Sequence, residues 1–357
     1  MEKEKKSKIK KILVNLTIFI LLIILTFSLV LKDQDVSQIF SVAAKVKKQY
    51  ILFAVLAMSI YILGEAVNIT RILKELGEKS KLISNIRYTL IGFFFSAITP
   101  AASGGQPMEI YYMHKDDISV ANSTLALLMQ LCSLQIVTIT VGTISAVIHF
   151  EVLKSGLIYL LILGIILNSS ALMLLIIAIF SKRLSEGLIK FAVKLLKFFR
   201  IPNVEKKQEK LEKELESYQT SAKYIKEHKI LMLKTVITTV VQMIAYYSVP
   251  YWIYLAFGLT EYNIFEILTL QAVLYATVSG IPLPGAVGVS EGGFLGIFKN
   301  VFPETIISSA MLLTRGANFY LFIIISAIIV MISTFREKKI EKKQMQETEV
   351  LTEKSEK

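Results

Sequence analysis

The chain has 357 residues, of which 54% are hydrophobic, and a formal net charge of +12. Its apolar residues come in blocks of about 20, the length that an α-helix needs to cross a bilayer. Little of the chain remains outside these blocks, whereas a soluble catalytic domain needs roughly 100 residues. Composition therefore excludes a soluble enzyme and predicts a membrane protein with several spans.

The basic residues are concentrated in three segments, 1–11, 182–229 and 334–357. Each segment flanks an apolar block, as expected from the excess of lysine and arginine in cytoplasmic loops. The same segments suit contact with anionic lipid head groups at the cytoplasmic face. We therefore attribute the charge to membrane topology and expect no binding to nucleic acid.

The first apolar block, 12–31, follows a basic N-terminus, 1–11, which we place in the cytoplasm. The block is longer than the hydrophobic region of a typical signal peptide, and no convincing cleavage site follows it. We interpret it as an uncleaved first span. Apolar runs predict five further spans, at 50–70, 118–149, 156–180, 231–257 and 305–333.

Two more apolar segments, 86–112 and 262–300, are interrupted by proline and glycine. If 86–112 crossed the membrane once, the basic loop 181–230 would lie outside, against the positive-inside bias. We therefore predict that each broken segment returns to its own side, either as a re-entrant segment or as a pair of short helices. The expected fold is an all-α polytopic membrane protein with six full spans and two re-entrant segments, about eight membrane segments in all, and with both termini cytoplasmic.

In this topology each broken segment lies between two long spans, and the two units have opposite orientations. Broken helices at matching places in inverted units are typical of the substrate site of a secondary transporter. Internal sequence identity is too weak to prove a repeat. The prediction therefore depends on the number of membrane crossings before each unit, which sets the side of the membrane on which that unit begins. We expect the integral membrane domain, 12–335, to have this inverted-repeat organisation.

The large loop, 181–230, contains two predicted helices. Residues 184–200 read LSEGLIKFAVKLLKFFR, a basic amphipathic pattern typical of a helix in the cytoplasmic interface. Residues 203–229 carry acidic and basic side chains four positions apart, which predicts a solvated cytoplasmic helix, with partner binding as the alternative. The tail, 336–357, lacks an apolar face and is expected to be disordered.

The first break reads TPAASGGQPMEIYY, residues 99–112. Its prolines interrupt helical hydrogen bonding, and Gly104 and Gly105 allow backbone conformations that other residues avoid. Backbone groups freed in this way must be buried in protein or line a watery cavity. Because Gln106 and Glu109 lie beside the break, we interpret it as half of a substrate cavity; a tight turn between helices is the alternative.

The second break reads VSGIPLPGAVGVSEGGFLGIF, residues 278–298. Glu291 within it is costly in a membrane unless it is hydrated, paired or accepting backbone N–H bonds. Alternatively, it is a first-turn charge favoured by a helix dipole. Arg315 lies in the last span, where a central arginine costs about 2.5–3.5 kcal/mol. We expect it to face the cavity and to pair with Glu291, Glu109 or a lipid phosphate, with snorkelling to the interface as the alternative.

The sequence contains no recognisable catalytic or metal-binding motif. Cys132 is the only cysteine, so no intrachain disulfide forms, and the three histidines lack metal-ligand spacing. The patterns GxxxxGK[ST], GxSxG and HExxH do not occur. We therefore expect no catalytic residues, no metal, no cofactor and no use of ATP by this chain.

The succession TPAASGGQP with YY, then PLPGAVGVSEGG, then an arginine in the last span resembles a known family. It is similar to the transmembrane flippase region of lysylphosphatidylglycerol synthases, the multiple peptide resistance factors, and to their stand-alone relatives. By this resemblance the family motifs are Gly104 to Pro107, Pro284 to Glu291, and Arg315. Arg71 also matches a family position, although Ile72 stands where relatives often have tryptophan.

Full-length members of that family carry a C-terminal soluble domain that transfers lysine from charged tRNA to phosphatidylglycerol. This chain stops about where that domain would begin, so transferase activity is not expected of it by itself. The resemblance implies instead a flippase for phospholipids in the bacterial cytoplasmic membrane.

The expected substrate-binding residues are Gly104, Gly105, Gln106, Pro107, Glu109, Tyr112, Pro284, Gly285, Gly288, Glu291, Arg315 and Arg71. One alternative is a membrane component of lysyl-phosphatidylglycerol synthesis that works with a separate lipid synthase. The other is a scaffold that binds partners through residues 184–229. Assembly into a homo-oligomer is left open.

Overall fold

The computed structural model describes residues 41–148, 157–181 and 204–336, together with residues 17, 183 and 187. All regular structure in these ranges is helical, and no strand occurs there. The long helices are α3 (Lys48–Glu75), α6 (Val120–Ile148), α8 (Leu157–Phe180), α10 (Val204–Glu227) and α11 (Lys229–Ala256). A further long helix, Glu304–Arg336, comprises α14 (Glu304–Arg315), the π-helical turn η3 (Gly316–Tyr320) and the turns that follow it.

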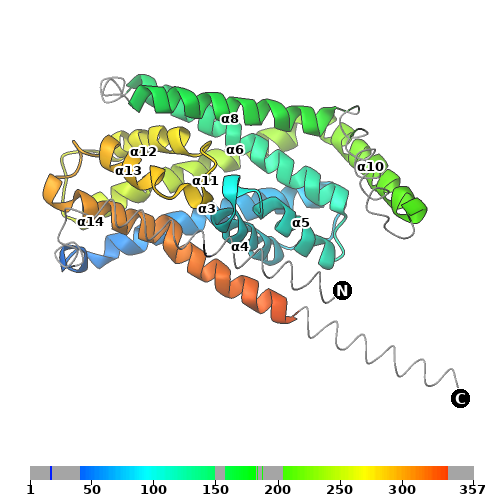
Figure 1. Cartoon of the computed structure of the whole chain (residues 1–357), viewed down its shortest axis with the longest axis horizontal. Helices are drawn as coiled ribbons and strands as arrows, with labels where there is room; N and C mark the ends of the chain where they lie inside the picture. Colours follow the sequence, from blue (N-terminus) through cyan, green and yellow to red (C-terminus); the bar gives the residue numbers. More distant parts are fainter. Residues whose placement is uncertain are drawn as a thin grey trace, which may run out of the picture.

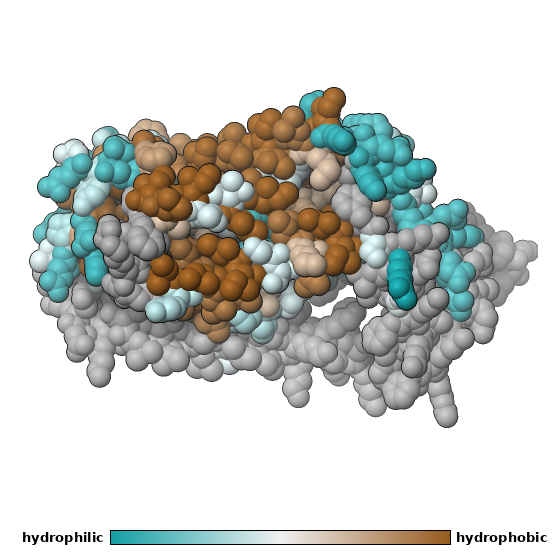
Figure 2. All heavy atoms as spheres, turned by 90° about the horizontal axis from the view of Figure 1, so that it is seen from above, coloured by the Kyte–Doolittle hydropathy of each residue, from teal (hydrophilic) through white to brown (hydrophobic). Residues whose placement is uncertain are grey.

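Five of the described helices are long and apolar enough to cross a membrane: α3, α6, α8, α11 and Glu304–Arg336. They coincide with five of the predicted spans. Figure 2 shows a broad hydrophobic band across one face of the molecule, with hydrophilic side chains gathered at both ends. Such a band is what a helical protein presents to the bilayer core, and it agrees with a polytopic membrane protein.

Three predicted segments fall largely outside the described residues. They are the first span, 12–31, the interfacial helix, 184–200, and the tail, 336–357. The predicted charged helix, 203–229, is confirmed as α10, which contacts α6, α8 and α11. There Ser221 donates a hydrogen bond to the side-chain oxygen of Asn122 on α6, at 2.8 Å.

The two broken segments form pairs of short helices, which is the second of the two forms expected for them. The first pair is α4 (Leu82–Ile98) and α5 (Gly105–Lys115), and the second is α12 (Ile264–Val278) and α13 (Val289–Ile297). Between the helices of each pair the chain passes through a short 3-10 turn, η1 (Pro100–Ala102) in the first and η2 (Pro284–Ala286) in the second.

These two turns have the same unusual backbone. After the leading proline, φ is 53° at both Ala101 and Ala102, and it is 59° at Gly285 and 49° at Ala286. Left-handed backbone costs an L-residue roughly 1–2 kcal/mol, and only glycine adopts it freely. The recurrence of this conformation at corresponding places supports the equivalence of the two breaks, which internal sequence identity was too weak to establish.

The long helices that precede the two helix pairs, α3 and α11, run antiparallel. Helices α3 and α11 pack along their length in opposite directions: the Lys47 amide donates to the Ala256 carbonyl at 3.0 Å, and Arg71 donates to the Lys234 carbonyl at 3.0 Å. In Figure 1 the α4–α5 pair lies in one half of the molecule and the α12–α13 pair in the other. Their turns, η1 and η2, contact each other between the two halves.

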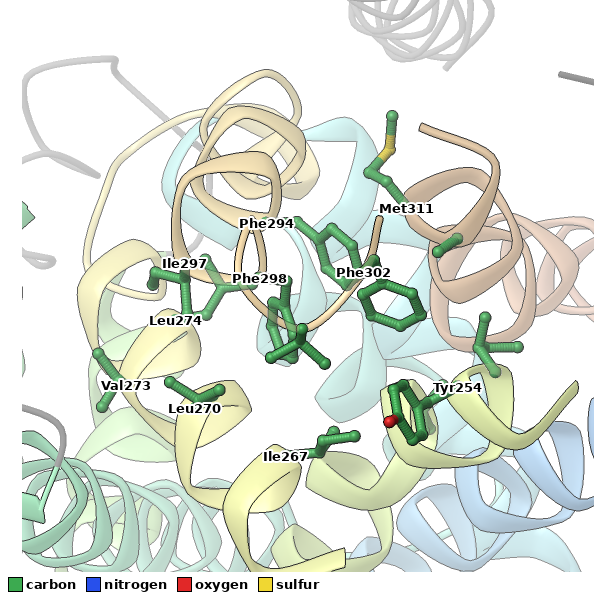
Figure 3. Packing of buried hydrophobic residues seen from close by; sticks show 14 of the residues in the cluster. Tyr254, Ile267, Leu270, Val273, Leu274, Phe294, Ile297, Phe298, Phe302 and Met311 are labelled. Atoms are coloured by element: carbon green, nitrogen blue, oxygen red, sulfur yellow. The ribbon is translucent and has the colours of Figure 1, made fainter. Parts of the chain in front are cut away.

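Apolar packing holds each pair against the long helices. Around the second pair, Leu270 and Leu274 of α12 face Phe294 of α13 and Phe298 at its C-terminal end, with Phe302 beside them (Figure 3). The Phe294 and Phe298 rings stack with their centroids 4.5 Å apart. Such pairs contribute about 0.5–1.5 kcal/mol beyond the burial of their area. The first pair packs in the same way through a separate cluster that includes Tyr88, Ile91 and Phe95. Apolar packing therefore fixes the helices that flank each turn.

Candidate functional site

A cavity of about 760 Å³ lies where the two turns meet. Its walls come from both turns and from α3, α4, α5, α6, α8, α11, α12, α13 and the last helix. The first break contributes Ala101, Ala102, Gln106 and Glu109. The second contributes Ser279 and the residues that follow it as far as Leu283, then Gly285, Ala286 and Ser290. The structure thus brings together two segments that lie about 180 residues apart in the chain.

Arg315 lines this cavity and forms an ion pair with Glu291. Its Nε donates to Glu291 Oε1 at 2.7 Å, and its Nη2 donates to the Gly285 carbonyl at 3.1 Å. The guanidinium also lies over the ring of Phe319, 4.0 Å from the centroid, a favourable cation–π geometry. Of the two side chains expected as partners of Arg315, Glu291 and Glu109, the structure pairs it with Glu291.

Glu291 is completely buried and has several hydrogen-bond donors around it. In addition to Arg315, it accepts from the Gly288 amide at 2.7 Å and from the Tyr320 hydroxyl at 3.1 Å. Since Gly288 is the N-cap of α13, the carboxylate also caps this helix, as the helix-dipole alternative proposed. Glu291 does not itself line the cavity; its contacts position Arg315 and the second turn.

Glu109 and Gln106, on α5, face the cavity from the opposite turn. The Glu109 side chain is 3% exposed, and its Oε2 has no hydrogen-bond partner among the described residues. It fits against α4 because residue 92 is glycine: a Cβ there would overlap Glu109 Oε1. The break therefore delivers a buried carboxylate to the cavity wall.

Sequence reasoning missed Glu65, which lines the same cavity from α3. It is the only charged residue in the predicted span 50–70. An ionisable residue inside a span usually faces a polar cavity, and this signal could have identified it. Glu109 lines this cavity from α5, so two acidic side chains from different helices share it.

Three tyrosines that were not predicted also line the cavity: Tyr61, Tyr246 and Tyr275. The rings of Tyr61 and Tyr246 have centroids 5.2 Å apart, and those of Tyr246 and Tyr275 are 5.3 Å apart. Tyrosine combines an apolar ring with a hydroxyl that donates and accepts hydrogen bonds. The cavity therefore has a mixed surface, apolar along the rings and polar at their tips.

Polar side chains on α6 do two different things. Gln130 accepts from Asn68 at 2.8 Å and donates to Gln242 at 3.2 Å, and so forms hydrogen bonds between helices. Gln135 and Thr138 line the cavity, as Gln130 also does. The network thus joins α3, α6 and α11 directly beside the cavity.

Several predicted site residues lie outside the cavity wall. Gly104 is the N-cap of α5, and its amide donates to Thr99 at 2.9 Å; Gly105 and Pro107 form the first turn of that helix. Tyr112 is buried within 3.3 Å of the Thr334 hydroxyl. These residues, with Pro284 and Gly288, shape or support the turns rather than line the cavity.

Arg71 also lies away from the cavity. It donates to Asn68 at 2.9 Å and to the Thr238 hydroxyl at 3.0 Å, and so ties α3 to α11. Of the twelve expected residues, the cavity is lined by Gln106, Glu109, Gly285 and Arg315.

Comparison with known proteins places this architecture in a family. A family described as "Lysylphosphatidylglycerol synthase TM region" matches residues 12–326. The chain is also 25% identical over 276 residues to a protein of Archaeoglobus fulgidus described as "UPF0104 membrane protein", covering 74% of this chain and 80% of that protein. The family match extends over both helix pairs and Arg315, and so confirms the expected resemblance. The chain therefore belongs to the family of lysylphosphatidylglycerol synthase transmembrane regions.

Proposed function

We propose that this protein is a lipid transporter that moves a polar phospholipid between the leaflets of the bacterial cytoplasmic membrane. The observation that carries the proposal is the cavity of about 760 Å³ between the two turns, which is lined by Arg315, Glu109 and Glu65 in a protein whose outer face bears a hydrophobic band (Figure 2). Charged groups are expensive at membrane depth, and they usually mark a substrate or ion pathway.

The cavity has a side that lipid can reach. Leu174 of α8 lines the cavity and is also 66% exposed, so the wall at this point is in contact with the surroundings of the protein. Its neighbours Met173 and Ile177 are exposed as well, which makes this part of α8 apolar on its outer side. A lipid head group would enter here while its acyl chains stayed in the bilayer.

The polar groups have complementary roles in this proposal. Arg315 would bind the phosphate, since a guanidinium presents several donors in a planar fork. Glu291 holds that fork in place through Nε. Gln106 would orient the head group, and the carboxylates of Glu65 and Glu109 would face its cationic or hydroxyl groups.

Lipid translocation in liposomes tests this function. Purified protein would be reconstituted with head-group-labelled anionic and amino lipids, and arrival in the other leaflet measured by quenching from one side. We expect movement with the wild type and a loss of at least about tenfold with Gln106→Ala and Arg315→Lys, because lysine keeps the charge but loses the fork. Gln208→Ala and Arg336→Lys, at positions outside the cavity, are the matched controls.

The liposome experiment and two further measurements separate the alternatives. Equal movement in all variants would mean that the breaks are structural turns. No movement of any lipid by folded wild type would contradict the transporter. Lysyl-phosphatidylglycerol could form in cells that express this chain together with a separate synthase, and not in cells that express this chain without the synthase. That result would favour the synthesis component instead. Loss of function on replacing residues 184–229 would favour the scaffold.

A further inference from the structure

Three charged residues line the cavity: Glu65, Glu109 and Arg315. The positive charge of Arg315 is already matched by Glu291, at 2.7 Å. Neither Glu65 nor Glu109 forms an ion pair with any residue in the described parts of the chain. The cavity therefore contains two carboxyl groups and no basic side chain to balance them.

The surroundings of Glu109 make two ionised carboxylates unfavourable together. Its Oε2 is buried without a hydrogen-bond partner among the described residues. Thr89, one helical turn before Gly92 on the adjoining α4, lines the same cavity; it is 2% exposed, and its hydroxyl also has no partner there. An unpaired buried hydroxyl and an unpaired buried carboxyl in the wall of one cavity indicate a position that a further ligand completes. Like charges in a poorly solvated site cannot both persist without a cation or a proton.

The other titratable groups that face the carboxyls do not supply that charge. They are Tyr61 on α3, Tyr246 on α11 and Tyr275 on α12, whose phenols are neutral hydrogen-bonding groups near neutral pH. From the last helix and α13 comes the Arg315–Glu291 pair, which is neutral as a unit. Cys132 of α6 lies in the hydrophobic cluster around the first helix pair, not in the cavity wall.

A proton suits this site better than a metal ion. The described residues contain no group of three or more His, Cys, Asp or Glu side chains able to hold a metal. Two carboxyl groups supply too few oxygens for the six or so that a hard cation such as Ca²⁺ takes. A proton needs one carboxyl oxygen, and it reduces the charge of the pair from two to one.

We infer that Glu65 and Glu109 form a carboxyl pair that holds one proton, and that the release and uptake of this proton drive lipid movement through the cavity. The second half of this inference rests on the proposed function, whereas the first half does not. The pair takes a proton from one side of the membrane at a carboxylate oxygen. It returns the proton to the other side when the cavity changes the side to which it is open.

The protonated pair is tested without any transport measurement. Infrared difference spectra of wild type against Glu65→Gln and Glu109→Gln, in nanodiscs at neutral pH in H2O and D2O, report the carbonyl band of an un-ionised carboxyl. We expect the band in the wild type and its loss in Glu109→Gln, which removes the buried carboxyl. In Glu65→Gln the band should remain but shift, because the buried Glu109 carboxyl keeps its proton and loses its acidic neighbour. Glu261→Gln, at an exposed position outside the cavity, should leave the band unchanged. Ionised carboxylates in the wild type, or a carboxylate signal that follows sodium concentration, would overturn the pair.

Coupling between proton movement and lipid movement is tested in liposomes with the membrane potential clamped at zero. With one proton per lipid, a gradient of about one pH unit supports up to about tenfold accumulation of lipid in one leaflet. We expect such asymmetry with the wild type and with Glu261→Gln, and a leaflet ratio near one with Glu65→Gln and Glu109→Gln. If the wild type moved lipid equally with and without the pH gradient, the coupling would be overturned and the proposed function would stand. A carboxyl band without lipid movement under any condition would overturn the proposed function and the coupling, but support the proton pair.

Discussion

Arg315 and Glu291 form a buried ion pair that joins the last membrane helix to the second turn. The Nε–Oε1 distance is 2.7 Å, and the two side chains are 8% and 0% exposed. Since Arg315 also binds the Gly285 carbonyl, the pair fixes the backbone of the turn as well as the guanidinium that faces the cavity. One interaction thus sets both the shape of the site and the position of its positive charge.

Replacing Arg315 by methionine should lower stability strongly. Removing one partner of a buried pair typically costs about 3–5 kcal/mol, because the remaining charge is buried alone. The double variant Arg315→Met with Glu291→Gln should recover much of this loss. The midpoint of thermal unfolding in one detergent measures both. If the double variant lost as much stability as the two single variants lose when their effects are added, the charges would not be coupled.

The two turns should respond in opposite directions to exchange of glycine and alanine. A Cβ at Gly285, where φ is 59°, would overlap the ring of Phe319, so Gly285→Ala should destabilise by about 1–3 kcal/mol. Ala101 adopts the matching left-handed backbone without being glycine. Ala101→Gly should therefore stabilise by about 0.5–1 kcal/mol. This is the gain from relieving the left-handed strain, reduced by the larger conformational entropy that glycine loses on folding. Thermal unfolding of both variants measures the signs; destabilisation by both would contradict the equivalence of the turns.

Single-cysteine labelling should place the loops after α3 and α11 on opposite sides of the membrane. The two helices are antiparallel, and Lys79 and Glu261 are exposed in the loops that follow them. Cys132 is buried and should give little background. An impermeant thiol reagent on intact cells should label Glu261→Cys, and label Lys79→Cys only after permeabilisation. Labelling of both from the same side would rule out the proposed inverted topology.

Two glycine-to-alanine variants should separate the site from the scaffold. At Gly92 the added Cβ would overlap the carboxylate of Glu109, the end of a side chain that can move. At Gly164 it would overlap the backbone carbonyl of Ala276, which cannot move easily. Gly164→Ala should therefore destabilise by about 1–3 kcal/mol, whereas Gly92→Ala should change stability less and slow lipid movement.

Thermal unfolding and the liposome assay, applied to both glycine variants, check this contrast. Wild-type transport by a folded Gly92→Ala protein would argue against a role for the position of Glu109. A Gly164→Ala protein as stable as the wild type would show that α8 and α12 have room to separate.

Much of the architecture could be predicted from the sequence. Five predicted spans agree with described helices to within a few residues, and both breaks were located by their prolines and glycines. These features are local, because a run of apolar residues or a proline acts on the helix that contains it. The family motifs were equally accessible, since they are contiguous in the chain.

The membership of the site was harder to predict. Arg71 and Tyr112 were expected to bind substrate, but they pack between helices, whereas Glu65 was passed over and lines the cavity. A helix presents several faces, and the sequence of one helix does not say which face meets a distant partner. A charged residue inside a span identifies a candidate, but not its neighbours.

The sequence by itself therefore determined that the chain is a helical membrane protein with two broken segments, each close to buried charge. The sequence left three partners open for Arg315. It also left two interpretations open for Glu291, a paired or hydrated carboxylate and a first-turn helix charge. Only the tertiary structure decided that Arg315 pairs with Glu291 and that Glu109 shares the cavity with Glu65. The physical reason is that helix formation and membrane insertion depend on neighbours in the chain, whereas charge pairing depends on which helices pack together.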